Sequence, residues 1–187
     1  MKWIVIAIVV FVVVIVPIVI YNGLINKRNS LKSVTSTLDV MLQKRYDLIP
    51  NLVSSVKEYM KHEAGTLTEI TKLRTELSNG EVSEADRFKK ENELSEKMRG
   101  LNISVENYPD LKASTNFVQL QRSLNEVEEQ LSAARRAYNA SALEYNNARE
   151  QFPSNVIAGM MKLKEAPYYE APESVQEKPD IKELFNS

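Results

Sequence analysis

The sequence predicts an all-α protein, in which an N-terminal transmembrane helix is continuous with an elongated antiparallel bundle of three to four long helices. Three observations predict this fold class. The 187-residue chain opens with an uncharged apolar run from Trp3 to Tyr21, it contains only 5 glycines and 7 prolines, and its other apolar residues recur at steps of three and four. Few helix-breaking residues and a period near 3.6 favour long amphipathic helices.

The first predicted element is the apolar run itself. Its length of ~28 Å as a helix approaches the hydrocarbon thickness of a bilayer, about 30 Å. The run is longer than the apolar part of a cleaved secretory signal, and no small-residue cleavage site follows it. Aromatic and basic residues of the kind that lie at membrane interfaces bracket the run: Trp3, Tyr21, Lys27 and Arg28.

The same helix is expected to continue past Gly23 to about Tyr46, because one apolar face persists there. Pro50 then marks either a turn between helices or a sharp kink. A helix of about thirty residues is expected from that point to about Ser78. Basic residues after the apolar run outnumber those before it, which favours a cytoplasmic location for the bulk of the chain by the positive-inside rule.

Glycine, serine and proline divide the central part of the chain. Gly80 suits the left-handed position that ends a helix, and Ser83 begins a capping box for a third helix that runs to about Leu101. Pro109 is the next helix breaker. The third helix has few apolar residues and is expected to be the least stable.

The cleanest periodicity follows and predicts a helix of about 36 residues with a coiled-coil-like seam. The seam residues are Phe117, Leu120, Leu124, Val127, Leu131, Ala134, Tyr138, Ala142, Tyr145, Ala148 and Phe152. The earlier helices are its expected antiparallel partners, although an intermolecular coiled coil is also compatible with the pattern. The predicted organisation is a membrane anchor at 1–23, a helical bundle at 24–165 and a Pro-rich, mildly acidic, flexible tail at 166–187.

Composition argues against several functions. The 24 basic and 25 acidic residues give no positive surplus for nucleic-acid binding, and the chain has no cysteine and a single histidine. His62-Glu63 begins like a zinc-protease motif, but Thr66 occupies the position of the second histidine. The sequence therefore predicts no catalytic residue, no metal site, no cofactor and no enzyme activity.

Two clusters are candidates for docking a protein partner. Arg45, Asp47 and Asn51 surround the proline break, and Phe152, Val156 and Ile157 belong to a short apolar segment after the long helix. The first cluster is also explained as a turn that fixes the order of the helices. The second cluster either closes one end of the bundle or meets the membrane or a partner.

Taken together, these landmarks resemble the LemA family of bacterial membrane proteins. The most specific matches are YN at 21–22, QKRYDLIPNLV at 43–53, YPDLKA at 108–113 and FPSNVIAG at 152–159, and the resemblance extends to about Glu170. It implies an N-terminal anchor and an elongated helical bundle at the cell membrane, with no agreed biochemical activity.

The leading hypothesis is a non-enzymatic, membrane-anchored scaffold, with the lipid bilayer, further copies of the chain and other membrane proteins as its partners. The alternative is a monomeric adaptor or regulator of a membrane enzyme, such as a protease or a sensor kinase.

Overall fold

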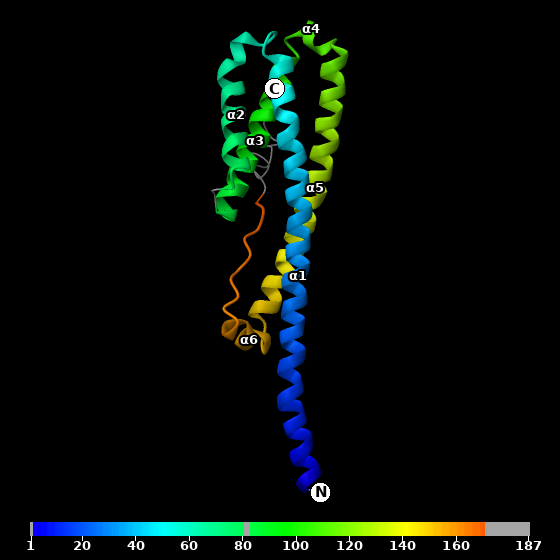
Figure 1. The fold of residues 1–187 in the computed structure, drawn as a ribbon, viewed down its shortest axis with the longest axis vertical. Coiled ribbons are helices and arrows are strands. Elements are labelled where there is room, and N and C mark those ends of the chain that lie inside the picture. Colours follow the sequence, from blue (N-terminus) through cyan, green and yellow to red (C-terminus); the bar gives the residue numbers. More distant parts are fainter. Residues whose placement is uncertain (1, 81–82, 171–187) are drawn as a thin grey trace, which may run out of the picture. The chain divides into compact units, whose positions relative to one another are not determined.

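The computed structural model describes residues 2–80 and 83–170, apart from the side chains of residues 5, 7–10, 12, 84 and 85. Every regular element in these ranges is helical, which confirms the predicted all-α class (Figure 1). The elements are α1 (Lys2–Val56), the short 3₁₀ helix η1 (Lys61–Glu63), α2 (Ala64–Ser78), α3 (Glu84–Val105), α4 (Pro109–Lys112), α5 (Thr115–Glu150) and α6 (Ser154–Met160).

The chain divides into two compact units. Unit 1 comprises residues 1–45 and 123–168, and unit 2 comprises residues 46–122 and 169–187. Helix α1 is continuous from Lys2 to Val56, so the predicted continuation of the N-terminal helix past Gly23 is confirmed. Residues 171–187, most of the predicted flexible tail, lie outside the described residues.

In unit 1 the N-terminal part of α1 packs antiparallel to the C-terminal part of α5 (Figure 1). Two ion pairs fix this direction, because Lys27 meets Glu144 at 2.7 Å whereas Arg45, further along α1, meets the earlier residue Glu128 at 3.1 Å. Apolar side chains from both helices are buried in unit 1: Leu24, Leu38, Leu42, Leu124, Val127, Leu131, Ala134, Tyr138, Ala142 and Tyr145.

The predicted seam of α5 is largely buried within the two units. Phe117 at its start belongs to unit 2, and the residues from Leu124 to Tyr145 belong to unit 1. Leu120 and Ala148 are half-buried. Phe152 is the exception, since 83% of its surface is exposed. Helix α5 ends at Glu150, so Phe152 lies beyond the helix to which the periodic pattern applies.

In unit 2 the C-terminal end of α1 packs with α2, α3, α4 and the start of α5. Helices α2 and α3 run antiparallel, as the pairs Glu76–Lys90 at 2.7 Å and Glu69–Lys97 at 2.5 Å require. The predicted break between them is confirmed: Gly80 has φ +69°, and the hydroxyl of Ser83 accepts a hydrogen bond from the backbone N–H of Asp86 at 3.2 Å.

Pro50 does not produce a turn. Residues 45–56 stay helical, so the prediction of a helix of about thirty residues beginning at Pro50 is wrong, and α2 has 15 residues. A proline inside a helix leaves the carbonyl four residues earlier without its usual donor, and that carbonyl belongs to Tyr46. The side chain of Arg74 on α2 donates to it through Nε at 3.3 Å. A side chain from a neighbouring helix thus compensates for the proline.

This compensation predicts energetic coupling between positions 50 and 74. Pro50→Ala restores a backbone donor and should stabilise the protein by about 1–2 kcal/mol, less than the ~3 kcal/mol typical of an uncompensated helical proline. Arg74→Met, which preserves most of the aliphatic bulk, should cost about 1–2 kcal/mol because the carbonyl of Tyr46 loses its donor.

The double variant distinguishes this mechanism from independent effects. In the Pro50→Ala background the cost of Arg74→Met should fall by about 1 kcal/mol, as measured by denaturant unfolding of the four proteins. Strictly additive free energies of unfolding would show that Arg74 does not substitute for the missing donor.

Among the residues that the structure describes, no helix combines the length and the apolar character needed to cross a membrane. The predicted transmembrane helix is therefore not supported by this test and stays a proposal. Of the run from Trp3 to Tyr21, the side chains of residues 5, 7–10 and 12 lie outside the described part.

Candidate functional site

The predicted docking cluster at the proline break does not assemble as expected. Arg45 is fully buried in unit 1 and bonded to Glu128, so it presents no surface to a partner. Asp47 and Asn51 are exposed on α1, one helical turn apart. The structure thus separates Arg45 from the other two residues, and docking remains a prediction for Asp47 and Asn51 alone.

Two buried polar groups have structural explanations within their own units. Glu91 of α3 is fully buried in unit 2 and accepts a hydrogen bond from the hydroxyl of Tyr46. Asn146 of α5, in unit 1, accepts from the backbone N–H of Ala166 at 3.0 Å and donates to the carbonyl of the same residue at 2.9 Å. Both groups join segments distant in sequence, and they are best explained as interactions that hold the fold together.

The segment after α6 is fixed to α5 by several such bonds. The hydroxyls of Tyr138 and Tyr145 donate to the carbonyls of Pro167 and Lys164, each at 2.9 Å. Burial raises the pKa of the Tyr145 hydroxyl, and the nearby Arg149 only partly offsets this effect. Tyr145 therefore stays protonated and remains a donor through the physiological pH range.

The second predicted docking cluster is on the surface of unit 1. Val156 of α6 and Phe152 just before it are 57% and 83% exposed, and Ile157 is half-buried. Met160, in the same apolar segment, adds a further side chain that is 79% exposed. Ala158 is buried and attaches the other side of α6 to the unit.

The predicted membrane-interface residues all lie on α1. Trp3 and Tyr21 are 83% and 47% exposed. Lys27 pairs with Glu144, and the positive charge of Arg28 lies close enough to Tyr145 to lower its pKa slightly against the larger effect of burial. The structure therefore links both basic residues to α5.

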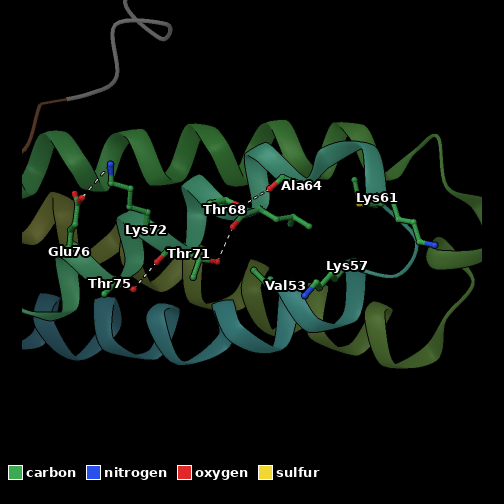
Figure 2. Close-up of a pocket in the computed structure, with 11 residues that line it drawn as sticks. Val53, Lys57, Lys61, Ala64, Thr68, Thr71, Lys72, Thr75 and Glu76 are labelled. Carbon is green, nitrogen blue, oxygen red and sulfur yellow. Dashed lines mark hydrogen bonds and ion pairs between the residues drawn. The ribbon is translucent and has the colours of Figure 1, made fainter.

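Sequence reasoning missed an apolar groove in unit 2. It has a volume of about 680 Å³ and lies along α2, between this helix and the end of α1 (Figure 2). The lining residues are Val53, Lys57, Met60, Lys61, Ala64, Leu67, Thr68, Thr71, Lys72, Thr75 and Glu76. The groove depends on α1 ending at Val56, and residues 57–63 contain no proline or glycine that would have revealed this end.

The groove has an apolar wall and a basic edge. The hydroxyls of Thr68, Thr71 and Thr75 donate to carbonyls one turn earlier on α2, at 2.8–2.9 Å, so their hydrogens are directed into the helix (Figure 2). Glu76 is held by Lys90, which keeps the pKa of its carboxyl below the usual value. A groove with this lining favours an apolar group that carries negative charge over a polar metabolite.

The described residues were expected to contain no metal site. They contain no group of three or more His, Asp or Glu side chains arranged to hold a metal ion. His62 lies exposed in η1. Other surface features of the described residues are the exposed apolar side chains of α1 and α6 and the groove along α2.

Comparison with known proteins identifies relatives by sequence. The family model described as "LemA family" matches residues 34–182. It begins after the Tyr21-Asn22 landmark and extends past Glu170, where the resemblance seen in the sequence was expected to end. Residues 171–182 therefore fall within the family match.

Curated relatives show the same similarity. The chain is 27% identical to Protein LemA of Metamycoplasma hominis over 165 residues, which cover 88% of this chain and 75% of that protein. It is 25% identical to the magnetosome proteins MamQ 1 and MamQ 2 of Paramagnetospirillum magneticum, over 85% of this chain and 65% of each of them. The chain thus spans less than two thirds of the MamQ proteins. Because the family model covers well over half of the sequence, the chain belongs to the LemA family.

Proposed function

We propose that this protein is a non-enzymatic scaffold, anchored in a bacterial membrane by residues 3–21, that self-assembles or organises partner proteins through its helical bundle. The large apolar side chains that the described surface exposes on α1 and α6 support a binding role.

The observation that carries the proposal is the exposure of the apolar run. Its described side chains have no partner element around them, and large ones are open to solvent on every side of the helix: Trp3, Ile4, Ile6, Phe11, Val13, Val14, Ile15, Val16, Ile18 and Val19. A helix that is apolar all round is stable only when something apolar covers it. Lipid covers all faces of a helix at once, whereas a single partner helix covers one.

Continuity of α1 gives the anchor a mechanical role. The apolar run and the buried residues Leu24, Leu38 and Leu42 belong to one uninterrupted helix. A rigid connection transmits the orientation of the anchor directly to unit 1, so that neighbouring copies present the same surface at the same angle. Repeated lateral contacts between such copies produce an ordered array.

The proposed orientation places the bulk of the chain on the cytoplasmic side. Lys27, Arg28 and Lys32 follow the apolar run, whereas Lys2 and the amino terminus precede it. An excess of basic residues next to a span favours the cytoplasmic side.

Cross-linking of the full-length chain in membranes tests self-assembly. The protein is reconstituted at decreasing protein-to-lipid ratios and treated with an amine-reactive cross-linker. A specific assembly yields the same oligomer bands throughout the dilution series. Bands that vanish in proportion to dilution would indicate random collisions and would overturn self-assembly.

The second candidate, a monomeric adaptor of a membrane enzyme, is supported by the exposed polar residues Asp47 and Asn51 on α1. An adaptor should lose a co-purifying partner when Asp47→Ala or Asn51→Ala is introduced while its helical content stays unchanged. Arg45 is unsuitable for this test because it is buried, and its replacement disturbs the fold.

A further inference from the structure

The strongest unexplained feature of unit 1 is an apolar patch on and just before α6. Phe152, Val156 and Met160 are spaced by four residues, and each is more than half exposed. Val156 and Met160 lie one turn apart on α6 and therefore share a face. Phe152, two residues before the helix begins at Ser154, adds a third exposed apolar side chain. Large apolar side chains grouped in this way mark a surface that meets another apolar phase.

The patch cannot turn inward, because the opposite side of α6 is fixed. Ala158 is buried, and its carbonyl accepts a hydrogen bond from the N–H of Leu163 at 3.1 Å. The two bonds between Asn146 and Ala166 and the bond from Tyr145 to Lys164 hold the segment that follows. The exposure of the patch is therefore a fixed property of unit 1.

The ion pairs in unit 1 place α6 at a defined level along α1. Glu144 lies opposite Lys27, and α5 runs antiparallel to α1. Six residues further, ~9 Å at 1.5 Å per residue, α5 ends at Glu150, and six residues before Lys27 lies Tyr21. Helix α6 therefore starts level with the end of the apolar run, and Figure 1 shows it at the height of the blue part of α1.

Charge at this level suits an anionic surface. Lys162 and Lys164 directly follow the patch, and Arg28 lies one residue beyond Lys27 on α1. The nearby carboxylates also have basic partners, since Glu144 pairs with Lys27, and Glu150 and Glu165 share Arg149 at 2.6 and 3.3 Å. Apolar side chains flanked by lysines are the composition of an element that lies in the headgroup region of a membrane.

We propose that α6 is a second membrane contact, whose face of Phe152, Val156 and Met160 inserts at the boundary between headgroups and hydrocarbon of the bilayer that holds residues 3–21. This inference rests on the proposed anchor. It gives unit 1 two attachment points, and a body held at two points cannot rotate freely about the anchor. Unit 1 would then present a fixed face to its neighbours.

Because the sequence contains no cysteine, a label can be attached to a single introduced cysteine without removing native ones. Single cysteines are introduced into the full-length chain at three exposed positions of unit 1 and spin-labelled: Val14→Cys, Val156→Cys and, as a control on α5, Ala133→Cys. The proteins are reconstituted in vesicles of phosphatidylcholine and phosphatidylglycerol. Accessibility to oxygen, which concentrates in lipid, is compared with accessibility to a water-soluble nickel chelate.

The proposal predicts an oxygen-to-chelate ratio several-fold higher at position 156 than at position 133, and higher still at position 14. Met160→Cys should repeat the result for position 156. If position 14 is in lipid while 156 and 160 resemble 133, the interfacial role of α6 is overturned and the anchor stands.

Two other outcomes overturn the proposal differently. A water-exposed label at position 14 would overturn the anchor and, with it, the role of α6. Low accessibility of positions 156 and 160 to both reagents, with spin–spin broadening between copies, would show that a second chain covers the patch instead of lipid.

Discussion

Val14→Asp is expected to shift the partitioning of the protein from the membrane toward water by roughly a hundredfold. Val14 lies near the middle of the apolar run, and its side chain is 52% exposed, so the substitution removes no contact within the chain that would account for a folding defect. A charged side chain at the centre of a membrane helix costs about 2.5–3.5 kcal/mol of insertion free energy, which corresponds to roughly a hundredfold shift in partitioning. Aspartate is too short to reach the headgroups, so this cost is not relieved.

Val40→Asp supplies a matched control on the same helix. Val40 is 51% exposed, but it lies beyond the proposed membrane exit. Retention after alkaline extraction of membranes should fall sharply for Val14→Asp and stay unchanged for Val40→Asp. Equal retention of the two variants would show that residues 3–21 are not held in lipid.

Glu128→Gln is expected to lower the stability of unit 1 by about 2 kcal/mol, or about 4–8 °C in Tm. Its partner Arg45 has no exposed surface, so a guanidinium that loses a carboxylate here cannot be rehydrated. Removing one member of a fully buried pair costs 3–5 kcal/mol in general. The expected cost is smaller here because the side chain of Glu128 is 37% exposed and its charge is partly screened.

Glu144→Gln makes the same chemical change on the same helix in an exposed pair. Lys27 and Glu144 are 45% and 61% exposed, and exposed pairs contribute at most about 1 kcal/mol. Thermal unfolding of both variants, followed by circular dichroism, should show a clearly larger drop for Glu128→Gln. Shifts of equal size would mean that burial of Arg45 does not determine the strength of the pair.

Local chemistry was sufficient to predict much of the fold. The three-and-four spacing from Leu124 to Tyr145 predicted the buried face of α5, because such spacing places residues on one face whatever partner covers them. Gly80 and Ser83 predicted the break between α2 and α3, since left-handed backbone and side-chain capping are properties of those residues alone.

The end of α1 could not be predicted in the same way. Pro50 is a strong local helix breaker. Arg74, 24 positions later, donates to the carbonyl of Tyr46, which Pro50 leaves without a backbone donor, and the helix continues. The real end at Val56 is set by packing, since Met60 is fully buried and the N–H groups of Tyr59 and Met60 turn back to the carbonyl of Val56. Tertiary interactions of this kind cannot be recognised from a local sequence pattern.

The candidate functional surfaces were likewise only partly predictable from the sequence. The apolar character of residues 152–157 was visible in the sequence, but only the structure shows that Met160 joins Phe152 and Val156 on an exposed face. The burial of Arg45 and the groove along α2 depend on how helices pair, and neither follows from periodicity.

Assembly of the chain in the membrane is tested most directly by a native mass measurement. The protein, including residues 3–21, is released together with surrounding lipid at low protein density, and the mass of each particle is measured. Self-assembly predicts particles that contain a defined number of chains greater than one. Particles that hold a single chain at every density would contradict it and would favour the monomeric adaptor.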